Sequence, residues 1–260
     1  MTDASSLPEL QPAASLIVFR HGRIMPELLM IRRADMLTFA GGATVFPGGR
    51  VDPGDHELAS DMPGDPDWNA ARVACIRETV EETGLLLGVR GQVDADVATS
   101  LRAALASGEA FGRQLEAHGL SLDAGSLVPF ARWYPPGRVI RRFDTRFLLA
   151  DIGTGAVALS ADGTETSSQF WASPADLLAM GDRGEVRLMF PTRANITRIA
   201  RLGSFAAARE ESESQGVNPV TGEVLERDGK RWLTVTEGGG YDGYAEPLET
   251  AMRGDGASTD

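Results

Sequence analysis

Three glutamates lie close together in the stretch from Arg77 to Leu85, which reads Arg-Glu-Thr-Val-Glu-Glu-Thr-Gly-Leu. On a helix that advances about 100° per residue, Glu78, Glu81 and Glu82 fall within roughly one third of the circumference. The opposite side collects mainly apolar side chains, namely Val73, Ile76, Val80 and Thr83. Like charges at this spacing destabilise a helix by a few tenths of a kcal/mol per pair, whereas hard cations such as Mg²⁺ bind oxygen ligands. The pattern predicts a helix with one buried face and one face that holds a divalent cation.

The residues around this helix resemble the Nudix box. The first half of that signature is represented by Phe46-Pro47-Gly48-Gly49, and the second half is matched in register by Arg77, Glu78, Glu81, Glu82, Gly84 and Leu85. Asp55 stands where the family has a glutamate, and 21 residues separate it from Arg77, fourteen more than in the family signature. Insertions in loops cost little free energy, so the extra residues leave the helix itself intact.

The resemblance implies a hydrolase that cleaves a diphosphate linkage with Mg²⁺ or Mn²⁺. Its metal ligands would be Glu78, Glu81 and Glu82, and its catalytic residues Arg77, Glu81, Glu82 and Glu165. A later loop often supplies a further carboxylate in this family. Here Glu165 is the first choice for that role, and Asp144 competes with it unless it forms a salt bridge with Arg142 or Arg146.

The substrate is expected to be a small nucleoside-diphosphate-linked molecule, with coenzyme A or acyl-coenzyme A as the best match. The run from Leu28 to Ala34, followed by Gly42, partly resembles the motif that precedes the box in coenzyme A diphosphatases, although Thr38 replaces an arginine. ADP-ribose, NADH or a nucleotide sugar are alternative substrates. A Nudix-fold nucleotide-binding module without catalysis is the alternative from another class, which the intact helix carboxylates disfavour.

Arginine side chains grip phosphates through two parallel hydrogen bonds, so four arginines are candidates for substrate binding. They are Arg32, Arg33, Arg142 and Arg146. For each of them, a surface position or an ion pair is the competing interpretation.

Composition limits the remaining classes of function. The chain has 260 residues, a net charge of −12 and a pI near 4.8, which argue against binding to nucleic-acid backbones. A single cysteine, Cys75, excludes an intrachain disulfide and a multi-thiolate zinc site. The sequence has no apolar run of membrane-spanning length and no secretory leader, so no membrane and a cytoplasmic location are expected.

The expected fold is α/β, a Nudix-type α/β/α sandwich with a mixed central sheet, a helical insertion and a C-terminal hairpin extension. We expect a flexible tail over 1–13, a hydrolase domain over 14–210 with helical stretches at 96–120, an extension over 211–250 and a disordered tail over 251–260. Within the extension, a hairpin over 223–235 is expected to turn at Asp228-Gly229. The extension would pack on the body or on a partner subunit, which leaves a homodimer open. Within the domain we expect a loop over 49–68, a metal helix from Asp67 or Asn69 to Gly84, and one long helix over 192–210.

Overall fold

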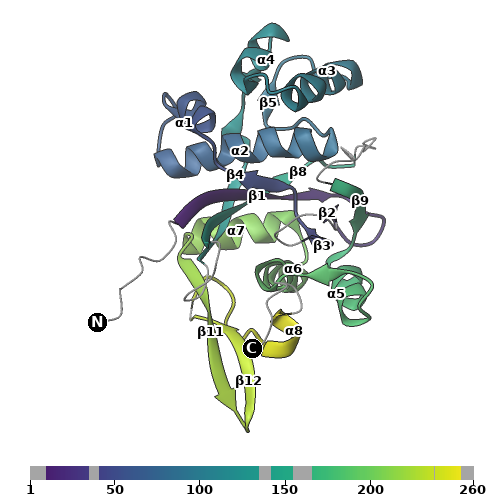
Figure 1. Ribbon diagram of the computed structural model, residues 1–260, viewed down its shortest axis with the longest axis vertical. Coiled ribbons are helices and arrows are strands. Elements are labelled where there is room, and N and C mark those ends of the chain that lie inside the picture. The colour runs from purple at the N-terminus through teal and green to yellow at the C-terminus, as the bar shows by residue number, and fades with distance from the viewer. Residues whose placement is uncertain (1–9, 35–40, 135–141, 155–165, 237, 253–260) are drawn as a thin grey trace, which may run out of the picture.

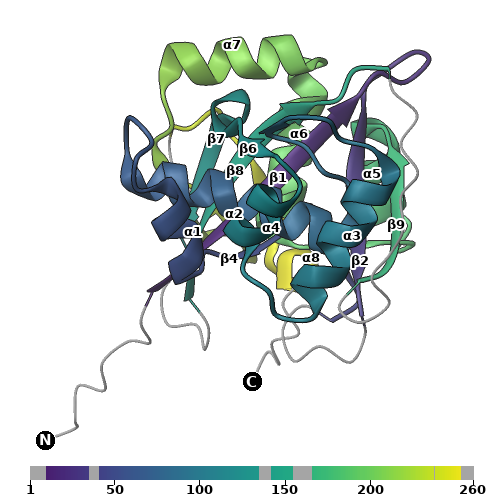
Figure 2. The ribbon, with the colours of Figure 1, turned by 90° about the horizontal axis from the view of Figure 1, so that it is seen from above.

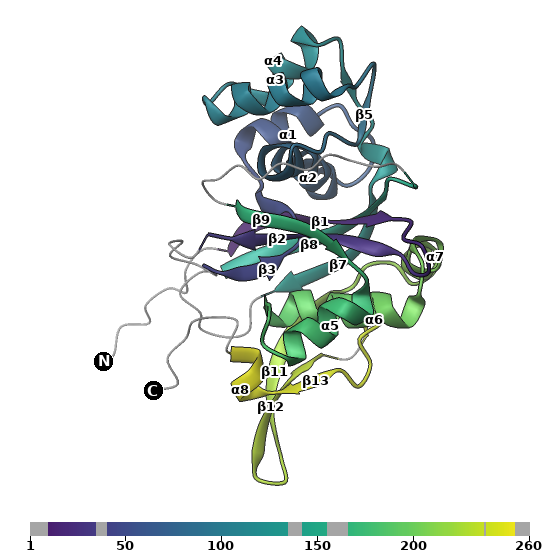
Figure 3. The ribbon, with the colours of Figure 1, turned by 90° about the vertical axis from the view of Figure 1, so that its right-hand side faces the viewer.

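A mixed β-sheet lies between two layers of helices in the computed structural model, which describes residues 10–34, 41–134, 142–154, 166–236 and 238–252 (Figures 1 and 3). Helices α1 to α4 lie on one side of the sheet, and α5, α6 and α7 on the other. This arrangement confirms the predicted α/β/α sandwich. None of the helices within these ranges combines the length and the apolar character that crossing a membrane requires.

Thirteen strands are present in the described residues. They are β1 (Leu10–Arg20), β2 (Glu27–Arg33), β3 (Ala43–Val45), β4 (Gly48–Arg50), β5 (Val89–Arg90), β6 (Ser121–Leu122), β7 (Val128–Tyr134), β8 (Arg142–Asp151), β9 (Thr166–Ala172), β10 (Arg187–Leu188), β11 (Pro219–Arg227), β12 (Lys230–Val235) and β13 (Ala245–Pro247). The same ranges hold eight α-helices. They are α1 (Pro53–Ala59), α2 (Pro66–Thr83), α3 (Ala95–Ala106), α4 (Phe111–Ala117), α5 (Pro174–Asp182), α6 (Phe190–Leu202), α7 (Phe205–Gln215) and α8 (Leu248–Met252).

Strand β1 is the centre of the sheet. It runs parallel to β8 and antiparallel to β2, and it also pairs with the short strand β4. Successive side chains of a strand point to opposite faces. Leu16 and Val18 therefore enter the core under α2, while Ile17 and Phe19 enter the core against α5, α6 and α7. One strand thus anchors both hydrophobic layers.

Two expected segments differ from the structure. The stretch over 49–68, expected to be a loop, contains strand β4 and helix α1. Helix α1 follows Asp52 and Pro53, a cap and a first-turn proline that start a helix despite the surrounding glycines and aspartates. The single helix expected over 192–210 is two helices, because Gly203 adopts the left-handed conformation with φ 76° and Ser204 caps α7.

The two chain ends also differ from expectation. Residues 10–13, expected in the flexible tail, belong to β1, whose first residue is paired with Arg142. Residues 251 and 252, expected in the disordered tail, close helix α8. The remaining residues of both expected tails lie outside the described ranges.

The C-terminal segment joins the sheet through a hairpin. Strand β11 runs parallel to β7 and antiparallel to β12, so the hairpin continues the sheet beyond β7. Asp228 and Gly229 have φ of 52° and 71°, values that fit the two-residue turn predicted for this pair.

Arg198 contacts both α7 and β7 from its position on α6. This side chain of α6 is 4% exposed; it pairs with Glu211 of α7 at 2.8 Å and donates to the carbonyl oxygen of Phe130 in β7 at 3.1 Å. Its guanidinium group also lies over the rings of Phe130 and Tyr241. A buried cation needs such a complete set of partners, since an unpaired one would be costly.

We expect Arg198→Met to lower the free energy of unfolding by about 3–5 kcal/mol, because it leaves a partly buried Glu211 with fewer partners. Chemical denaturation monitored by circular dichroism measures the change. The control is Arg209→Met, which removes an α7 ion pair whose side chains are both 55% exposed, and which should cost at most about 1 kcal/mol. Equal effects of the two substitutions would contradict this account.

Candidate functional site

Helix α2 carries the three glutamates and has well-defined ends. Asp65 caps its start by accepting hydrogen bonds from the backbone N–H groups of Asp67 and Trp68 at 2.9 and 3.0 Å. The helix begins at Pro66, one residue before the earliest start expected, and Gly84 ends it in the left-handed conformation as predicted. Its apolar face is buried against the sheet, including Cys75, so the thiol is a packing group whose pKa is raised by burial.

The last turn of α2 is held by the helical insertion. Figure 2 shows α3 and α4 overlying α2, and Arg102 of α3 donates to the carbonyl oxygens of Glu81 and Glu82 at 2.8 and 3.3 Å. The last turn of a helix places C=O groups beyond the reach of the helix's own N–H groups, and Arg102 donates to two carbonyls of this turn. A cation also suits the negative end of the helix dipole. The insertion therefore fixes the part of α2 that presents the glutamates.

Arg77 is the centre of the polar face. Its Nε and Nη2 atoms donate to the two oxygens of Asp55 at 3.0 and 2.8 Å, and Nη2 also donates to the carbonyl oxygen of Arg50 at 3.0 Å. Its Nη1 atom contacts Glu78 Oε1 at 2.8 Å and Glu81 Oε1 at 3.4 Å. One guanidinium group thus orients two of the predicted ligands, as the family resemblance implied for this arginine.

Asp55 lies in helix α1, at the box position that precedes the fourteen extra residues. Its side chain is 2% exposed, and it accepts from the backbone N–H of Asp52 at 2.9 Å besides binding Arg77 through two hydrogen bonds. A carboxylate this deeply buried is stabilised only by such charge-assisted contacts. The departure from the family signature at this position is therefore compatible with a formed site.

Two glycines bring β4 against the helix. The backbone N–H of Gly48 donates to Glu82 Oε2 at 2.8 Å. A Cβ atom on Gly49 would lie 2.3 Å from Glu78 Oε1, and one on Gly48 would lie 2.3 Å from the carbonyl oxygen of Ala14. At Gly48 the obstacle is backbone and φ is 152°, so the close approach of β4 to β1 requires glycine there. At Gly49 the obstacle is the carboxylate end of Glu78, which a larger residue would displace.

The electrostatics of the glutamates favour a bound cation. Burial, with the like charge of Glu81, raises the pKa of Glu78 to about 7 despite the nearby Arg77. Burial also raises the pKa of Glu81, again against the opposing effect of Arg77. A single guanidinium group therefore does not compensate the carboxylates that surround it, and a divalent cation would relieve this deficit.

The chemical type of the ligands suits a hard divalent ion, because three carboxylates occupy one face of α2. Glu81 is the most accessible of them, with a side chain 33% exposed, whereas Glu82 is buried. Within the described part of the chain, no three carboxylate, imidazole or thiol groups stand close enough together to form a metal site. Glu78 accepts a hydrogen bond from Arg77, and Glu82 accepts one from the backbone of Gly48. For the three glutamates to bind one ion together, these two contacts would have to rearrange.

Asp144 and Arg146 belong to another part of the molecule. Asp144 accepts two hydrogen bonds from Arg132, at 2.9 and 2.7 Å, and lies 3.2 Å from Arg146, so the expected salt bridge is present and includes a further arginine. Arg146 is 3% exposed, pairs with Asp67 at 2.9 Å and lies over the ring of Trp68. These contacts favour the ion-pair interpretation of both residues.

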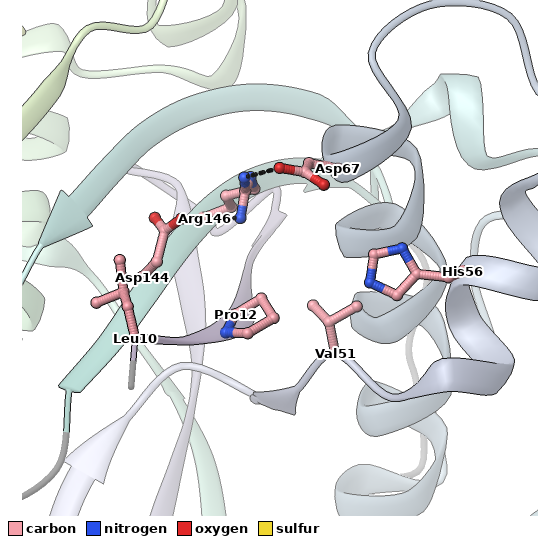
Figure 4. A pocket seen from close by; sticks show the side chains of 7 residues that line it. All are labelled: Leu10, Pro12, Val51, His56, Asp67, Asp144 and Arg146. Atoms are coloured by element: carbon pink, nitrogen blue, oxygen red, sulfur yellow. Dashed lines mark hydrogen bonds and ion pairs between the residues drawn. The ribbon is translucent and has the colours of Figure 1, made fainter. Parts of the chain in front are cut away.

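Figure 4 shows the cavity that these two residues line, which has a volume of about 210 Å³. Its other walls come from the start of β1, from α1 and from the first turn of α2, through Leu10, Pro12, Val51, His56 and Asp67. Ten residues of helix separate Asp67 from Arg77, or about 15 Å along the axis. The cavity therefore lies toward the opposite end of α2 from the glutamates.

Arg32 and Arg33 are neighbours on β2 and therefore point to opposite faces of the sheet. Leu29 packs in the core under α2 and Met30 in the core against α5 and α6. Alternation along β2 assigns Arg33 to the face of α2 and Arg32 to the other face, across a register shift in the pairing with β9 between these two residues. There Arg32 lines a cavity of about 240 Å³ with Thr44, Arg187 and neighbouring glycines.

The structure thus separates the expected arginines instead of gathering them at one point. Arg142 is the first residue of β8, but its side chain lies outside the described part of the structure, as does the whole of Glu165. Sequence reasoning missed Asp55 as the partner of Arg77, and Arg102 as the group that holds the end of α2. The position of Asp55 in the box pointed to a role in the site. For Arg102, the sequence offered only its position in the helical insertion.

Comparison with known proteins identifies the family. The crystal structure of a NUDIX hydrolase from Alicyclobacillus acidocaldarius is 32% identical, with a TM-score of 0.72 over 79% of this chain and 97% of that chain. The acyl-coenzyme A diphosphatase NUDT19 of Gallus gallus is 26% identical over 81% of this chain and 68% of that protein. No protein-family model matches the chain.

The chain belongs to the Nudix hydrolase family and is a Nudix-type hydrolase. Within that family it resembles the coenzyme A diphosphatase-like branch, as its similarity to the Gallus gallus protein indicates. Nudix hydrolases generally use divalent metal ions, which agrees with the carboxylate face of α2.

We expect Asp55→Asn to lower the free energy of unfolding by about 3 kcal/mol, because it removes the charge that neutralises a largely buried Arg77. Hydrolase activity should fall about tenfold to a hundredfold, the usual cost of losing a residue that orients a ligand. Asp52→Asn is the matched control, since Asp52 is 54% exposed, lies 3.6 Å from Arg77 and is replaced by an equally good helix cap. Similar losses in both variants would show that Asp55 has no special role.

The raised pKa of Glu78 predicts how the metal-free protein responds to pH. The folded state holds the proton up to about pH 7 and the unfolded chain only to about 4.5, so rising pH between these values destabilises the fold. Glu78→Gln stays neutral and should raise the unfolding free energy at pH 8 by on the order of 2 kcal/mol, with a gain that shrinks toward pH 5.

Thermal melts in a chelator measure this gain, with Glu116→Gln on the exposed side of α4 as the control. If Glu78→Gln and the unsubstituted protein had equal stability at every pH, the assigned burial of the Glu78 charge would be wrong.

Proposed function

We propose that this chain hydrolyses a diphosphate linkage in coenzyme A or acyl-coenzyme A, with Mg²⁺ or Mn²⁺ held by Glu78, Glu81 and Glu82. The observation that carries the proposal is the polar face of α2, where Arg77 contacts two of these glutamates and β4 contacts the third. When bound, a divalent ion would neutralise the diphosphate and lower the pKa of a water molecule.

The residues of the chain would divide the remaining work. Arg77, fixed by Asp55, keeps Glu78 and Glu81 on one side of the helix. Glu81 is the most accessible carboxylate of the three and is our first choice to accept a proton from water, with Glu82 as the second. Glu82 accepts a hydrogen bond from the Gly48 backbone, and once this contact rearranges it would hold the ion near β4.

Two further residues are proposed at the substrate side of α2. Arg33 lies on the same face of the sheet as α2, which makes it the best placed of the four arginines to bind a substrate phosphate. Its strand pairs with β9 so that Arg33 is opposite Thr166, the residue that directly follows Glu165 in the chain. This pairing supports Glu165 as the additional carboxylate.

The substrate proposal rests on the similarity to a protein named acyl-coenzyme A diphosphatase, together with the partial motif from Leu28 to Ala34. ADP-ribose, NADH and nucleotide sugars share the diphosphate that the metal face would bind, so they are the appropriate competitors in a test. These substrates differ in the groups attached to the diphosphate, so residues outside the metal face would have to discriminate between them.

Incubation with coenzyme A and Mn²⁺ should release 3′,5′-ADP and phosphopantetheine, which chromatography separates. Glu81→Gln and Glu82→Gln should each reduce the rate about 10²–10⁴-fold without unfolding the protein. Glu116→Gln should keep the full rate, because its position on α4 is exposed and distant from the box.

Two results would change the proposal in different ways. Hydrolysis of ADP-ribose or NADH but not of coenzyme A would replace the substrate while keeping the site. Near-normal rates in both glutamine variants would reject the assignment of the α2 glutamates to the reaction.

A further inference from the structure

The β11–β12 hairpin stands clear of the rest of the molecule. Figures 1 and 3 show it extending away from the sheet on the side opposite α3 and α4. Every residue from Glu223 to Arg227 is exposed, including two large apolar side chains, Val224 at 48% and Leu225 at 39%. Because they are adjacent in the strand, these two side chains lie on opposite faces of the hairpin, and each is accessible to a second strand on its own face.

Within the described part of the chain, one edge of this strand is paired over only three residues. On one side β12 pairs with β11 from Gly222 to Arg227, whereas on the other side β7 pairs with it only from Pro219 to Thr221. Among the described residues, no strand is paired with the second edge from Glu223 onward. A free edge presents unpaired N–H and C=O groups that readily accept another strand.

We propose that this edge pairs antiparallel with the same edge of a second copy of this chain, about a two-fold axis at Leu225. In this register Glu223 of each copy lies opposite Arg227 of the other, so both ends of the paired segment carry an ion pair. Sliding the pairing by one residue would instead place Glu223 opposite Glu226. Among the pairings within Glu223 to Arg227, the one centred on Leu225 is the one that places opposite charges at both ends.

The same register aligns the apolar groups. Glu223, Leu225 and Arg227 share one face of the strand, because they are two residues apart. Within the hairpin, Leu225 is paired with Trp232. Across the two-fold axis Leu225 would meet its own copy, which creates a row of Trp232, Leu225, Leu225 and Trp232 across four strands. Strands that block association usually carry charges that repel their own copy, whereas these charges attract it.

The dimer is expected to be weak and reversible. A pairing of five residues on each side buries less than the roughly 1,200 Å² of total surface found in stable specific complexes. We therefore expect a dissociation constant in the range of ~10–100 µM. Sedimentation velocity of the full-length protein from 2 to 200 µM should show the monomer converting to a dimer.

Reciprocal charge variants test the register. Glu223→Arg places like charges opposite Arg227, and Arg227→Glu places like charges opposite Glu223, so each variant alone should weaken the dimer about tenfold or more. Mixing the two variants restores opposite charges at both ends and should recover the dimer. The double variant Glu223→Arg with Arg227→Glu should also dimerise.

The control is Glu116→Arg on α4, which changes the net charge equally at the other end of the molecule and should leave the dimer unchanged. Circular dichroism establishes that each variant is folded. A monomer at 200 µM, or single variants that dimerise as well as the unsubstituted chain, would overturn the proposal. The result is independent of the hydrolase assignment, because no residue of α2 is altered.

Discussion

The buried ion pair between Arg77 and Asp55 is the interaction on which the polar face of α2 depends. It joins two helices, since Asp55 belongs to α1 and Arg77 to α2. A guanidinium group has five N–H donors in a fixed plane, and here they are distributed between Asp55, the Arg50 carbonyl oxygen and the glutamates. Because Asp55 fixes the plane of the guanidinium group, it also determines where the Nη1 atom of Arg77 meets Glu78 and Glu81.

The sequence predicted the parts of the fold that depend on local patterns. The buried face of α2, its end at Gly84 and the Asp228-Gly229 turn follow from periodicity and from single residues with special backbone preferences. Helix α1 was not predicted, because the many turn-forming residues around it favoured a loop over the helix that Asp52 and Pro53 can start. The break at Gly203 was missed because a glycine within a helical pattern is ambiguous until its conformation is known.

The site was predictable in its components but not in its contacts. The three glutamates and Arg77 could be named because they lie within one stretch of helix. Spacing along the chain carries no information about a contact between Asp55 and Arg77, or between Arg102 and the end of α2, because both depend on how insertions fold back. The separation of Arg32 from Arg33 follows from simple alternation, but only once the faces of β2 are known.

The inserted segments hold α2 at fixed points, because Asp55 of α1 binds Arg77 and Arg102 of α3 binds the last turn, while apolar side chains such as Ala59 and Leu101 share its core. These contacts fix particular points of each segment on α2, and they do not fix the length of the chain between those points. Segments between these anchor points could therefore lengthen, shorten or change sequence over evolution while the glutamates keep their positions. Variation of the inserted segments is in this way compatible with preservation of the carboxylate face of α2.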